Sequence, residues 1–172
     1  MDIARTPSTA DGNPEMADAA HEPHAPVTIR RADYTPPAWL VLNGDSLIFA
    51  NVSTGAEALG KADGVMVTRT VPDTSRYGSV RADDIGRITA FEEKQPGAGE
   101  INAGIYLLRR EVLADFPEAR PLSLERDVFP GLLGQSGGLM AHRVEAAFLD
   151  IGTPETLPQA EAFVAENQAE FA

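Results

Sequence analysis

Apolar residues recur along this chain in short runs separated by turn-forming residues, and the pattern begins near Trp39. Runs of about four to eight residues that alternate, or that are continuously apolar, are typical of β-strands. Longer stretches rich in Ala, Leu and Glu, bounded by Gly or Pro, are typical of helices. Strands are predicted at 39–42, 64–70, 77–81, 87–92, 101–108, 139–144 and 148–150, and helices at 54–61, at 110–116, after Ser123, and from Thr153-Pro154 to about Asn167.

This alternation of strands and helices predicts an α/β fold. Residues 82–86 join two predicted strands and contain Asp and Gly, so a hairpin is expected there. The stretch before residue 38 differs, because it is rich in Ala, Pro, Asp, Glu and His and shows little apolar periodicity. Such a composition does not offset its ordering entropy. We therefore expect a disordered N-terminal segment at 1–37 and one folded domain at 38–172.

The overall charge narrows the function classes. A formal net charge of −12 disfavours binding to nucleic acid or to an anionic membrane surface. The chain has no cysteine, which excludes disulfides, thiolate nucleophiles and zinc-thiolate sites. Its three histidines do not cluster in the sequence. No apolar segment has the length of a membrane span, and no secretory signal pattern is present, so a cytoplasmic protein is expected.

Two aspartates stand at predicted strand ends. Asn43-Gly44 forces a turn after the first strand and presents Asp45 at its carboxyl end, where open α/β sheets place ligands and metals. Asp150 ends the last predicted strand. From the pattern alone, Asp45 terminates a turn and Asp150 helps to cap the helix that follows, or the two together hold a metal ion.

Two further polar groups interrupt the pattern. Glu93-Lys94 follows the predicted strand 87–92, and such a charge run is commonly solvated. Asn102 and Gly104 lie inside an otherwise apolar strand. Both residue types lower strand stability, so either a ligand contact or a bend at a sheet edge explains their presence.

Five segments, taken in order, resemble the second half of a sugar-1-phosphate nucleotidyltransferase, closest to the mannose- or heptose-1-phosphate guanylyltransferase branch. The resemblance covers roughly residues 38–168. It implies a partial Rossmann-like, GT-A-like mixed sheet flanked by helices. It also implies the reaction of a sugar-1-phosphate with a nucleoside triphosphate to give an NDP-sugar and pyrophosphate. The segments are 42–46, 77–78, 91–94, 101–106 and 148–155.

The resemblance also assigns roles. Asp45 and Asp150 are the expected ligands of a Mg²⁺ cofactor, and Asp45 and Lys94 are the expected catalytic residues. Lysine serves in such a site as a mobile point charge on phosphate. Glu125, on the helix after Ser123, is expected either to face the sugar or to be an exposed helix residue. The expected substrate-binding residues are Asn43, Gly44, Gly78, Glu93, Lys94, Asn102 and Gly104.

One motif of that family has no counterpart in residues 1–40. Family members open with a strand, a glycine-rich loop of the type Gly-Gly-x-Gly-Thr-Arg-Leu and a downstream Pro-Lys. We therefore expect a truncated domain that lacks the N-terminal nucleotide-binding unit and whose activity alone is impaired. The alternatives are a non-catalytic sugar-phosphate-binding or regulatory subunit, and a gene fragment. A homo-oligomer, or a partner subunit that supplies the missing loop, fits the first of these.

Overall fold

The computed structural model describes residues 37–92, 94, 96–114 and 123–171. These residues all belong to one compact unit. The segment predicted to be disordered lies outside the described residues except for Pro37, and Glu93 also lies outside them.

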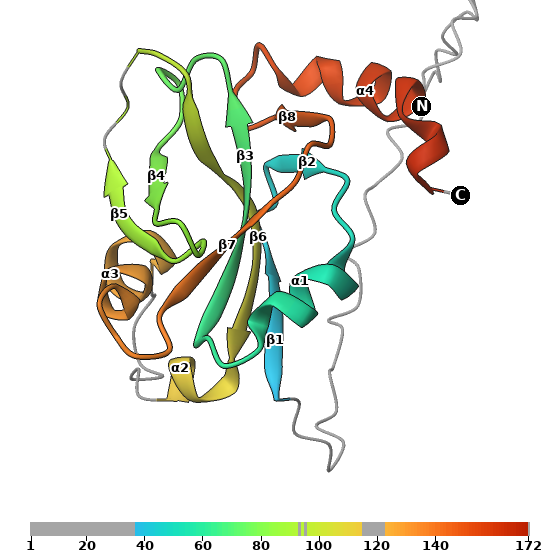
Figure 1. Ribbon diagram of the computed structural model, residues 1–172. Helices are drawn as coiled ribbons and strands as arrows, with labels where there is room; N and C mark the ends of the chain where they lie inside the picture. Colours follow the sequence, from blue (N-terminus) through green and yellow to red (C-terminus); the bar gives the residue numbers. More distant parts are fainter. Residues whose placement is uncertain (1–36, 93, 95, 115–122, 172) are drawn as a thin grey trace, which may run out of the picture. The chain divides into compact units, whose positions relative to one another are not determined.

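A long strand, β6, organises the larger sheet (Figure 1). One side of β6 pairs antiparallel with β3, which in turn pairs in parallel with β7. The other side of β6 is divided between β4 at its beginning and β1 at its end. The hairpin partner of β4 is β5, so the strand order is β5-β4-β6-β3-β7, with β1 beside β6. The strands are β1 (Ala38–Leu42), β3 (Gly64–Val71), β4 (Ser79–Ala82), β5 (Ile88–Glu92), β6 (Gly99–Arg109) and β7 (Leu139–Arg143).

A second sheet has two short strands, β2 (Ser46–Ile48) and β8 (Phe148–Asp150). They pair antiparallel, with Ser46 opposite Asp150. The sequence predicts β8 but not β2, because three residues are too few for a periodic pattern. Both strands are half-buried along their length.

Helices flank the larger sheet on both faces. Gly55 of α1 packs against Leu107 and His142, which places α1 on one face. Tyr106 and Leu108 alternate with Leu107 on β6, and they pack on the opposite face with the η1–α3 segment. The helical segments are α1 (Val52–Leu59), α2 (Arg110–Ala114), the π-helical turn η1 (Leu124–Val128), α3 (Phe129–Leu132), η2 (Leu157–Gln159), α4 (Ala160–Glu166) and η3 (Gln168–Phe171).

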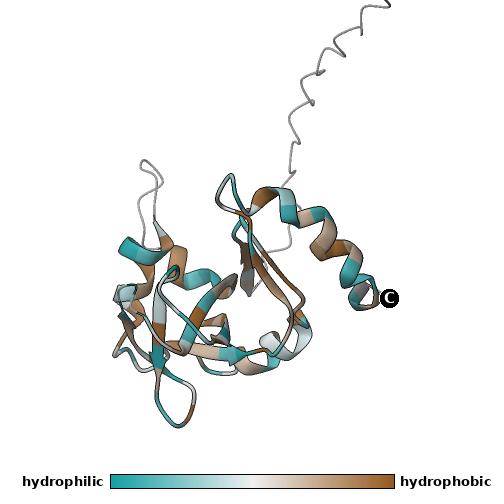
Figure 2. Ribbon diagram, turned by 90° about the horizontal axis from the view of Figure 1, so that it is seen from above, coloured by the Kyte–Doolittle hydropathy of each residue, from teal (hydrophilic) through white to brown (hydrophobic). Residues whose placement is uncertain are grey.

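The core lies between the sheet and the η1–α3 segment. Phe129 is fully buried, and its ring centroid lies 4.9 Å from that of Tyr106 and 5.8 Å from that of Phe91. Met66 and Leu108 have no exposed surface and complete the same cluster. In Figure 2 the central strands are mainly hydrophobic, whereas hydrophilic residues lie on the loops and on parts of the helices.

The start of η1 differs from its prediction. Arg126 stands where a capping box needs Glu or Gln, so no such box is predicted. In the structure Ser123 Oγ accepts from Arg126 N at 3.3 Å, and Asp127 Oδ2 accepts from Ser123 N at 2.8 Å. The wider π-helical turn brings residue 127, rather than 126, under the Ser123 N–H. The reciprocal cap is therefore present, displaced by one residue.

The last helix begins later than predicted. Thr153 opens a turn in which Thr156 N and Leu157 N both donate to its carbonyl, and α4 follows only after η2. Pro158 lacks the N–H that a continuous helix would need to bond the carbonyl four residues earlier. The predicted end is confirmed, because Asn167 caps α4. Phe163 of this helix stacks on Phe49, the residue that follows β2, with ring centroids 5.7 Å apart.

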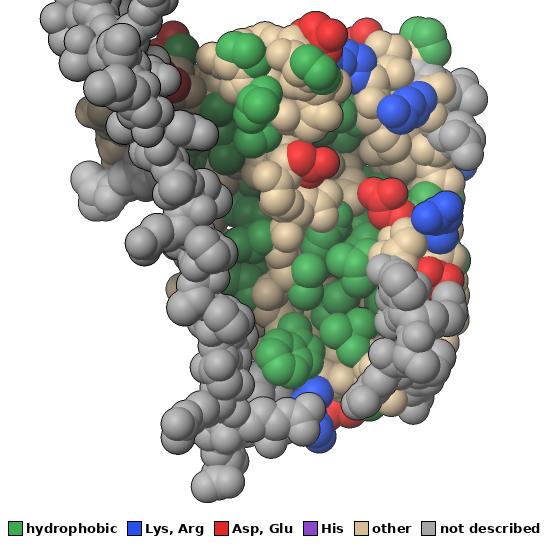
Figure 3. Space-filling view, turned by 180° about the vertical axis from the view of Figure 1, so that it is seen from behind, with side chains coloured by type: hydrophobic (Ala, Val, Ile, Leu, Met, Phe, Trp, Pro, Cys, Tyr) green, Lys and Arg blue, Asp and Glu red, His purple; other side chains and the backbone are tan. Residues whose placement is uncertain are grey.

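The outer edge of β1 has no strand partner among the described residues. Asn43 N donates to Gly104 O, and Arg110 N to Pro37 O, so the odd-numbered residues of β1 face β6. Leu40 and Leu42 therefore direct their backbone groups to the open edge, and their side chains are 47% and 60% exposed. Hydrophobic side chains gather over this region in Figure 3. None of the helices in the described ranges is long and apolar enough to cross a membrane.

Candidate functional site

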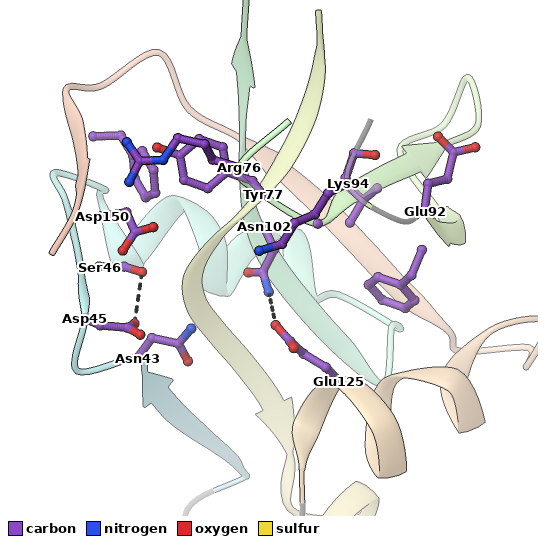
Figure 4. Close-up of a pocket in the computed structure, with 15 residues that line it drawn as sticks. Asn43, Asp45, Ser46, Arg76, Tyr77, Glu92, Lys94, Asn102, Glu125 and Asp150 are labelled. Atoms are coloured by element: carbon purple, nitrogen blue, oxygen red, sulfur yellow. Dashed lines mark hydrogen bonds between the residues drawn. The ribbon is translucent and has the colours of Figure 1, made fainter. Parts of the chain in front are cut away.

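A pocket of about 480 Å³ lies where the two sheets meet (Figure 4). Its size falls within the range of small-molecule sites. A second hollow of about 500 Å³ adjoins it and shares Asn43, Asp45 and Glu125. The lining residues of the first pocket are Asn43, Asp45, Ser46, Arg76, Tyr77, Gly78, Ser79, Val80, Phe91, Glu92, Lys94, Asn102, Glu125, Phe148 and Asp150.

Asp45 and Asp150 are brought together by the β2–β8 pair. Ser46 is the register partner of Asp150, and Ile151 N donates to Asp45 O at 2.8 Å. Ser46 Oγ donates to Asp45 Oδ1 at 3.4 Å, and Gly152 N donates to Asp150 Oδ1 at 2.8 Å. Two residues more than a hundred positions apart in the sequence thus present their carboxylates to one pocket.

The space between these carboxylates suits a hard cation. A Cβ built on Gly152 would lie 3.0 Å from Asp150 Oδ1 and 3.2 Å from Asp45 Oδ2, so both oxygens face a gap that glycine leaves open. No group of three or more His, Cys, Asp or Glu side chains in the described ranges is arranged to hold a metal. Mg²⁺ usually takes one or two carboxylates, with phosphate and water completing its shell, so this pair fits it.

Gly104 shapes the turn that carries Asn43 and Asp45. Its φ is +83°, and it lies where the register of β6 against β3 shifts. A Cβ there would lie 2.9 Å from Ser46 Cβ and 3.1 Å from Asn43 Cβ. Gly104 O also accepts from Asn43 N at 2.8 Å. The structure therefore places Gly104 beneath the turn and not among the pocket-lining residues, while Gly44 lines the second hollow.

Asn102 is held by three polar contacts. Its Oδ1 accepts from Gly104 N at 3.0 Å, which sets the amide orientation. Its Nδ2 donates to Tyr106 Oη at 2.8 Å and to Glu125 Oε1 at 3.5 Å. Burial raises the pKa of Tyr106 to about 12, partly offset by the hydrogen bond from Asn102. The phenol therefore stays protonated and holds Asn102 toward the pocket.

Glu125 lines both hollows and is also exposed, so its position is compatible with both of its sequence interpretations. Ser123 caps the π-helical turn η1, which begins at Leu124, and this cap sets the position of Glu125 in the turn. The motif Ser-x-Glu before a buried segment is too common to decide between the two interpretations from the sequence alone.

Two loops carry the remaining polar residues and are bonded to each other. Thr74 N donates to Gly97 O at 2.9 Å, and Gly97 N donates to Asp73 Oδ1 at 3.3 Å. Hydrogen bonds from the Ser75 side chain and backbone, and then from Gly97 N, lower the pKa of Asp73. These bonds join the turn before β4, which leads to Tyr77 and Gly78, to Gly97, three residues after Lys94.

The sequence did not single out Arg76, which also lines the pocket. The only available signal is its place directly before Tyr77-Gly78. Phe148 was likewise seen only as a strand residue, yet its ring lies 5.7 Å from that of Tyr77 and closes one wall.

The fold and this pocket agree with comparisons to known proteins, and the chain belongs to the nucleotidyl transferase family, whose model matches residues 9–167. That match begins well before residue 38, where the resemblance found in the sequence starts. Mannose-1-phosphate guanylyltransferase of Mycobacterium tuberculosis is 36% identical over 121 residues, which are 67% of this chain and 34% of that protein. UTP–glucose-1-phosphate uridylyltransferase of Synechocystis sp. is 33% identical over 122 residues, 66% of this chain and 31% of that protein.

Comparison with solved structures agrees with this family. HddC from Yersinia pseudotuberculosis superposes with a TM-score of 0.65 and 31% identity, covering 74% of this chain and 56% of that one. A second structure of HddC is complexed with GMP-PN and has a TM-score of 0.64. The expected family and the expected α/β mixed sheet flanked by helices are thereby confirmed. The chain spans about a third of the length of the curated relatives it matches.

Proposed function

We propose that this chain supplies the sugar-1-phosphate-binding and Mg²⁺-binding part of a nucleotidyltransferase that makes an NDP-sugar and pyrophosphate. One observation carries the proposal. Asp45, Asp150, Lys94 and Asn102 come from three distant parts of the sequence and line a single pocket of about 480 Å³. The names of the relatives indicate sugar-1-phosphates as the class of acceptor.

In the proposed reaction a phosphate oxygen of the sugar-1-phosphate attacks the α-phosphorus of the triphosphate. A new P–O bond forms there, the bond from that phosphorus to the bridging oxygen breaks, and pyrophosphate leaves with the electron pair. Little covalent chemistry falls to the side chains, so catalysis consists of positioning and charge neutralisation. Asp45 and Asp150 would hold Mg²⁺, which when bound neutralises phosphate charge.

The sugar end would lie against Gly78 and Asn102. A Cβ on Gly78 would meet no atom within 4 Å, so the backbone is open to close approach by a ligand. The Asn102 amide is fixed by Gly104 N and Tyr106 Oη, which makes it a preorganised contact for a hydroxyl group. Lys94 would neutralise the phosphate, and Glu93, outside the described residues, is proposed to bind sugar hydroxyls.

Calorimetric titration with mannose-1-phosphate and with glucose-1-phosphate, with and without Mg²⁺, tests the binding part of the proposal. We expect Mg²⁺-dependent binding that is lost in Asp45→Ala and Asp150→Ala. Asp84→Ala is the matched control, because Asp84 is an exposed aspartate in the β4–β5 turn, outside the pocket. Equal binding by all three variants would remove the assignment of the two carboxylates.

Measuring NDP-sugar synthesis by the chain alone distinguishes a catalytic protein from a non-catalytic binding module. Residues 1–40 contain no glycine-rich triphosphate loop, and losing even one preorganised donor costs on the order of a hundredfold in rate. We therefore expect sugar-phosphate binding with little NDP-sugar synthesis. Robust synthesis abolished by Asp45→Ala would contradict this expectation. Synthesis only after adding a polypeptide that carries such a loop would support a partner subunit, and binding without synthesis under either condition would support a non-catalytic module.

A further inference from the structure

Two cations line the pocket among the described residues, and they enter it from different loops. Lys94 follows β5, and Arg76 precedes β4. In Figure 4 the Lys94 amino group points toward Asn102, whereas the guanidinium end of Arg76 lies on the side of the pocket that holds Asp150. The sequence motifs account for Lys94 only.

Arg76 has no ion pair or hydrogen bond with any other residue in the described ranges. Its guanidinium carbon lies 6.0 Å from the centre of the Tyr77 ring, a long cation–π distance. The pKa of Glu155 is lowered, first by hydrogen bonds from its own backbone and Thr153 and to a smaller extent by the charge of Arg76. Arg76 thus retains its donors for a ligand.

The segment that carries Arg76 is nevertheless fixed in place. Ser75 donates through both its N and its Oγ to Asp73, and Tyr77 N donates to Thr74 O at 2.9 Å. Gly97, three residues after Lys94, donates its N–H to Asp73 and accepts through its carbonyl from Thr74 N. The two cations are therefore carried by one hydrogen-bonded pair of loops.

We infer that Arg76 is a second anion-binding residue of this site, which binds the phosphate of the acceptor from the Asp150 side while Lys94 binds it from the Asn102 side. The inference rests on the proposed function, because it concerns the same ligand. A guanidinium presents paired donors that match two phosphate oxygens, whereas an ammonium acts as a point charge. Arg76 would hold the phosphate end of the ligand close to Asp45 and Asp150, where the phosphoryl chemistry is proposed to occur. The sugar would then extend toward Gly78 and Asn102.

The test is a titration of the full-length chain with mannose-1-phosphate, glucose-1-phosphate and inorganic phosphate in the presence of Mg²⁺. The variants are Arg76→Ala, Arg76→Lys, Lys94→Ala and Arg110→Ala. Arg110 is the matched control, because it is an exposed arginine on α2, outside the pocket, and its removal changes the net charge equally. Thermal unfolding verifies that Arg76→Ala remains folded, because the variant removes an exposed side chain that makes no hydrogen bond or ion pair in the described ranges.

We expect Arg76→Ala to weaken sugar-phosphate binding at least about tenfold, the scale of one lost hydrogen bond to a charged group. Arg76→Lys should fall between Arg76→Ala and the wild type, and Arg110→Ala should bind within about twofold of the wild type at the same salt concentration. The affinity of Arg76→Ala should also depend less on salt concentration.

Two negative results are distinguishable. If the wild type binds and Arg76→Ala binds as well as Arg110→Ala, Arg76 is not an anion ligand, while the proposed function stands. If the wild type binds none of the three phosphate probes, the proposed function fails, and the role of Arg76 fails with it.

Discussion

The sheet core and the small β2–β8 sheet differ in how they are held together. In the core, β6 bonds neighbours on both sides, and Tyr106 and Leu108 are fully buried beside Phe129. The β2–β8 sheet has three residue pairs, and all six residues remain half-buried. The core determines the fold, whereas the small sheet carries Asp45 and Asp150 at one end.

This difference shows that the candidate site residues Asp45 and Asp150 lie at the less buried of the two regions. Asp45 is exposed and Asp150 is half-buried, so both carboxylates remain accessible to water and to a ligand. The connection between the two regions is the turn at Asn43, which bonds to Gly104 of β6. Substitutions in the core, at the connection and in the small sheet should therefore have separable effects.

The largest expected effect is in the core. Phe129→Ala removes a fully buried ring that stacks on Phe91 and packs at a tilt against Tyr106, and should lower the free energy of unfolding by about 3–5 kcal/mol. Leu47→Ala, in half-buried β2, should cost about 1 kcal/mol. Urea unfolding of both variants measures the contrast, and equal losses would show that the small sheet is as tightly integrated as the core.

The second largest effect is expected at Gly104, which lies beneath the turn that connects the two regions. Gly104→Ala forces a φ of +83° on an alanine and drives its Cβ against Ser46 and Asn43, so stability should fall by roughly 1–3 kcal/mol. Gly131→Ala is the control, because a Cβ there meets nothing within 4 Å inside α3, and it should stabilise by about 0.4–1 kcal/mol. Gly104→Ala should also weaken sugar-phosphate binding through displacement of Asn43. A variant of unchanged stability would contradict the close approach.

A smaller effect is expected from Mg²⁺ on the small sheet. If Asp45 and Asp150 hold the ion, free Mg²⁺ at ten times its Kd should stabilise the wild type by about 1.4 kcal/mol. Asp150→Asn should lose this gain while keeping its stability in chelator, and Asp84→Asn should retain it. Thermal unfolding at several Mg²⁺ concentrations provides the measurement. A gain of the same size in Asp150→Asn would place the ion elsewhere.

The smallest effect concerns Tyr106. Its pKa is raised from 10.0 to about 12 because the neutral phenol is buried. The folded state therefore keeps a proton that the unfolded state loses, and this stability is present below pH 10 and disappears as the pH rises toward 12. Tyr106→Phe should cost about 1 kcal/mol at neutral pH, through the lost bond to Asn102, and should lose less stability than the wild type over that alkaline range. Urea midpoints across the range, with phenolate absorbance as a second readout, test this.

Local patterns predicted the strands and the hairpin well, because burial of one or both faces of a strand determines whether its residues alternate or are continuously apolar. The same patterns missed β2, whose three residues have no period, and placed the start of α4 too early, because Thr153-Pro154 begins a turn that Pro158 prevents from continuing as a helix. Helix capping by Asp127 was missed because it depends on a π-helical turn that no local rule signals.

In the candidate site, too, some residues could be selected from the sequence and others only from the folded structure. Asp45, Lys94, Asn102 and Asp150 were selected through motif resemblance, and the structure brings all four to one pocket. Gly104 drew attention as an interruption in a strand, but its contacts with Ser46 and Asn43 arise only when β1 and β6 are paired. Arg76 enters the pocket from a loop, where charged residues are too frequent to stand out, whereas Glu125 was named through the resemblance with two interpretations left open.

The pairing of β1 has a consequence for synthesis of the chain. The strand is apolar along its length, and its single described partner is β6, which leaves the ribosome only after β3, β4 and β5 have been made. During that interval Trp39, Leu40 and Leu42 have no β6 to pair with, and unpaired apolar strands in incomplete chains are prone to aggregate. The yield of soluble protein should therefore depend on how fast the β6 segment follows, and slower translation between β1 and β6 should lower it.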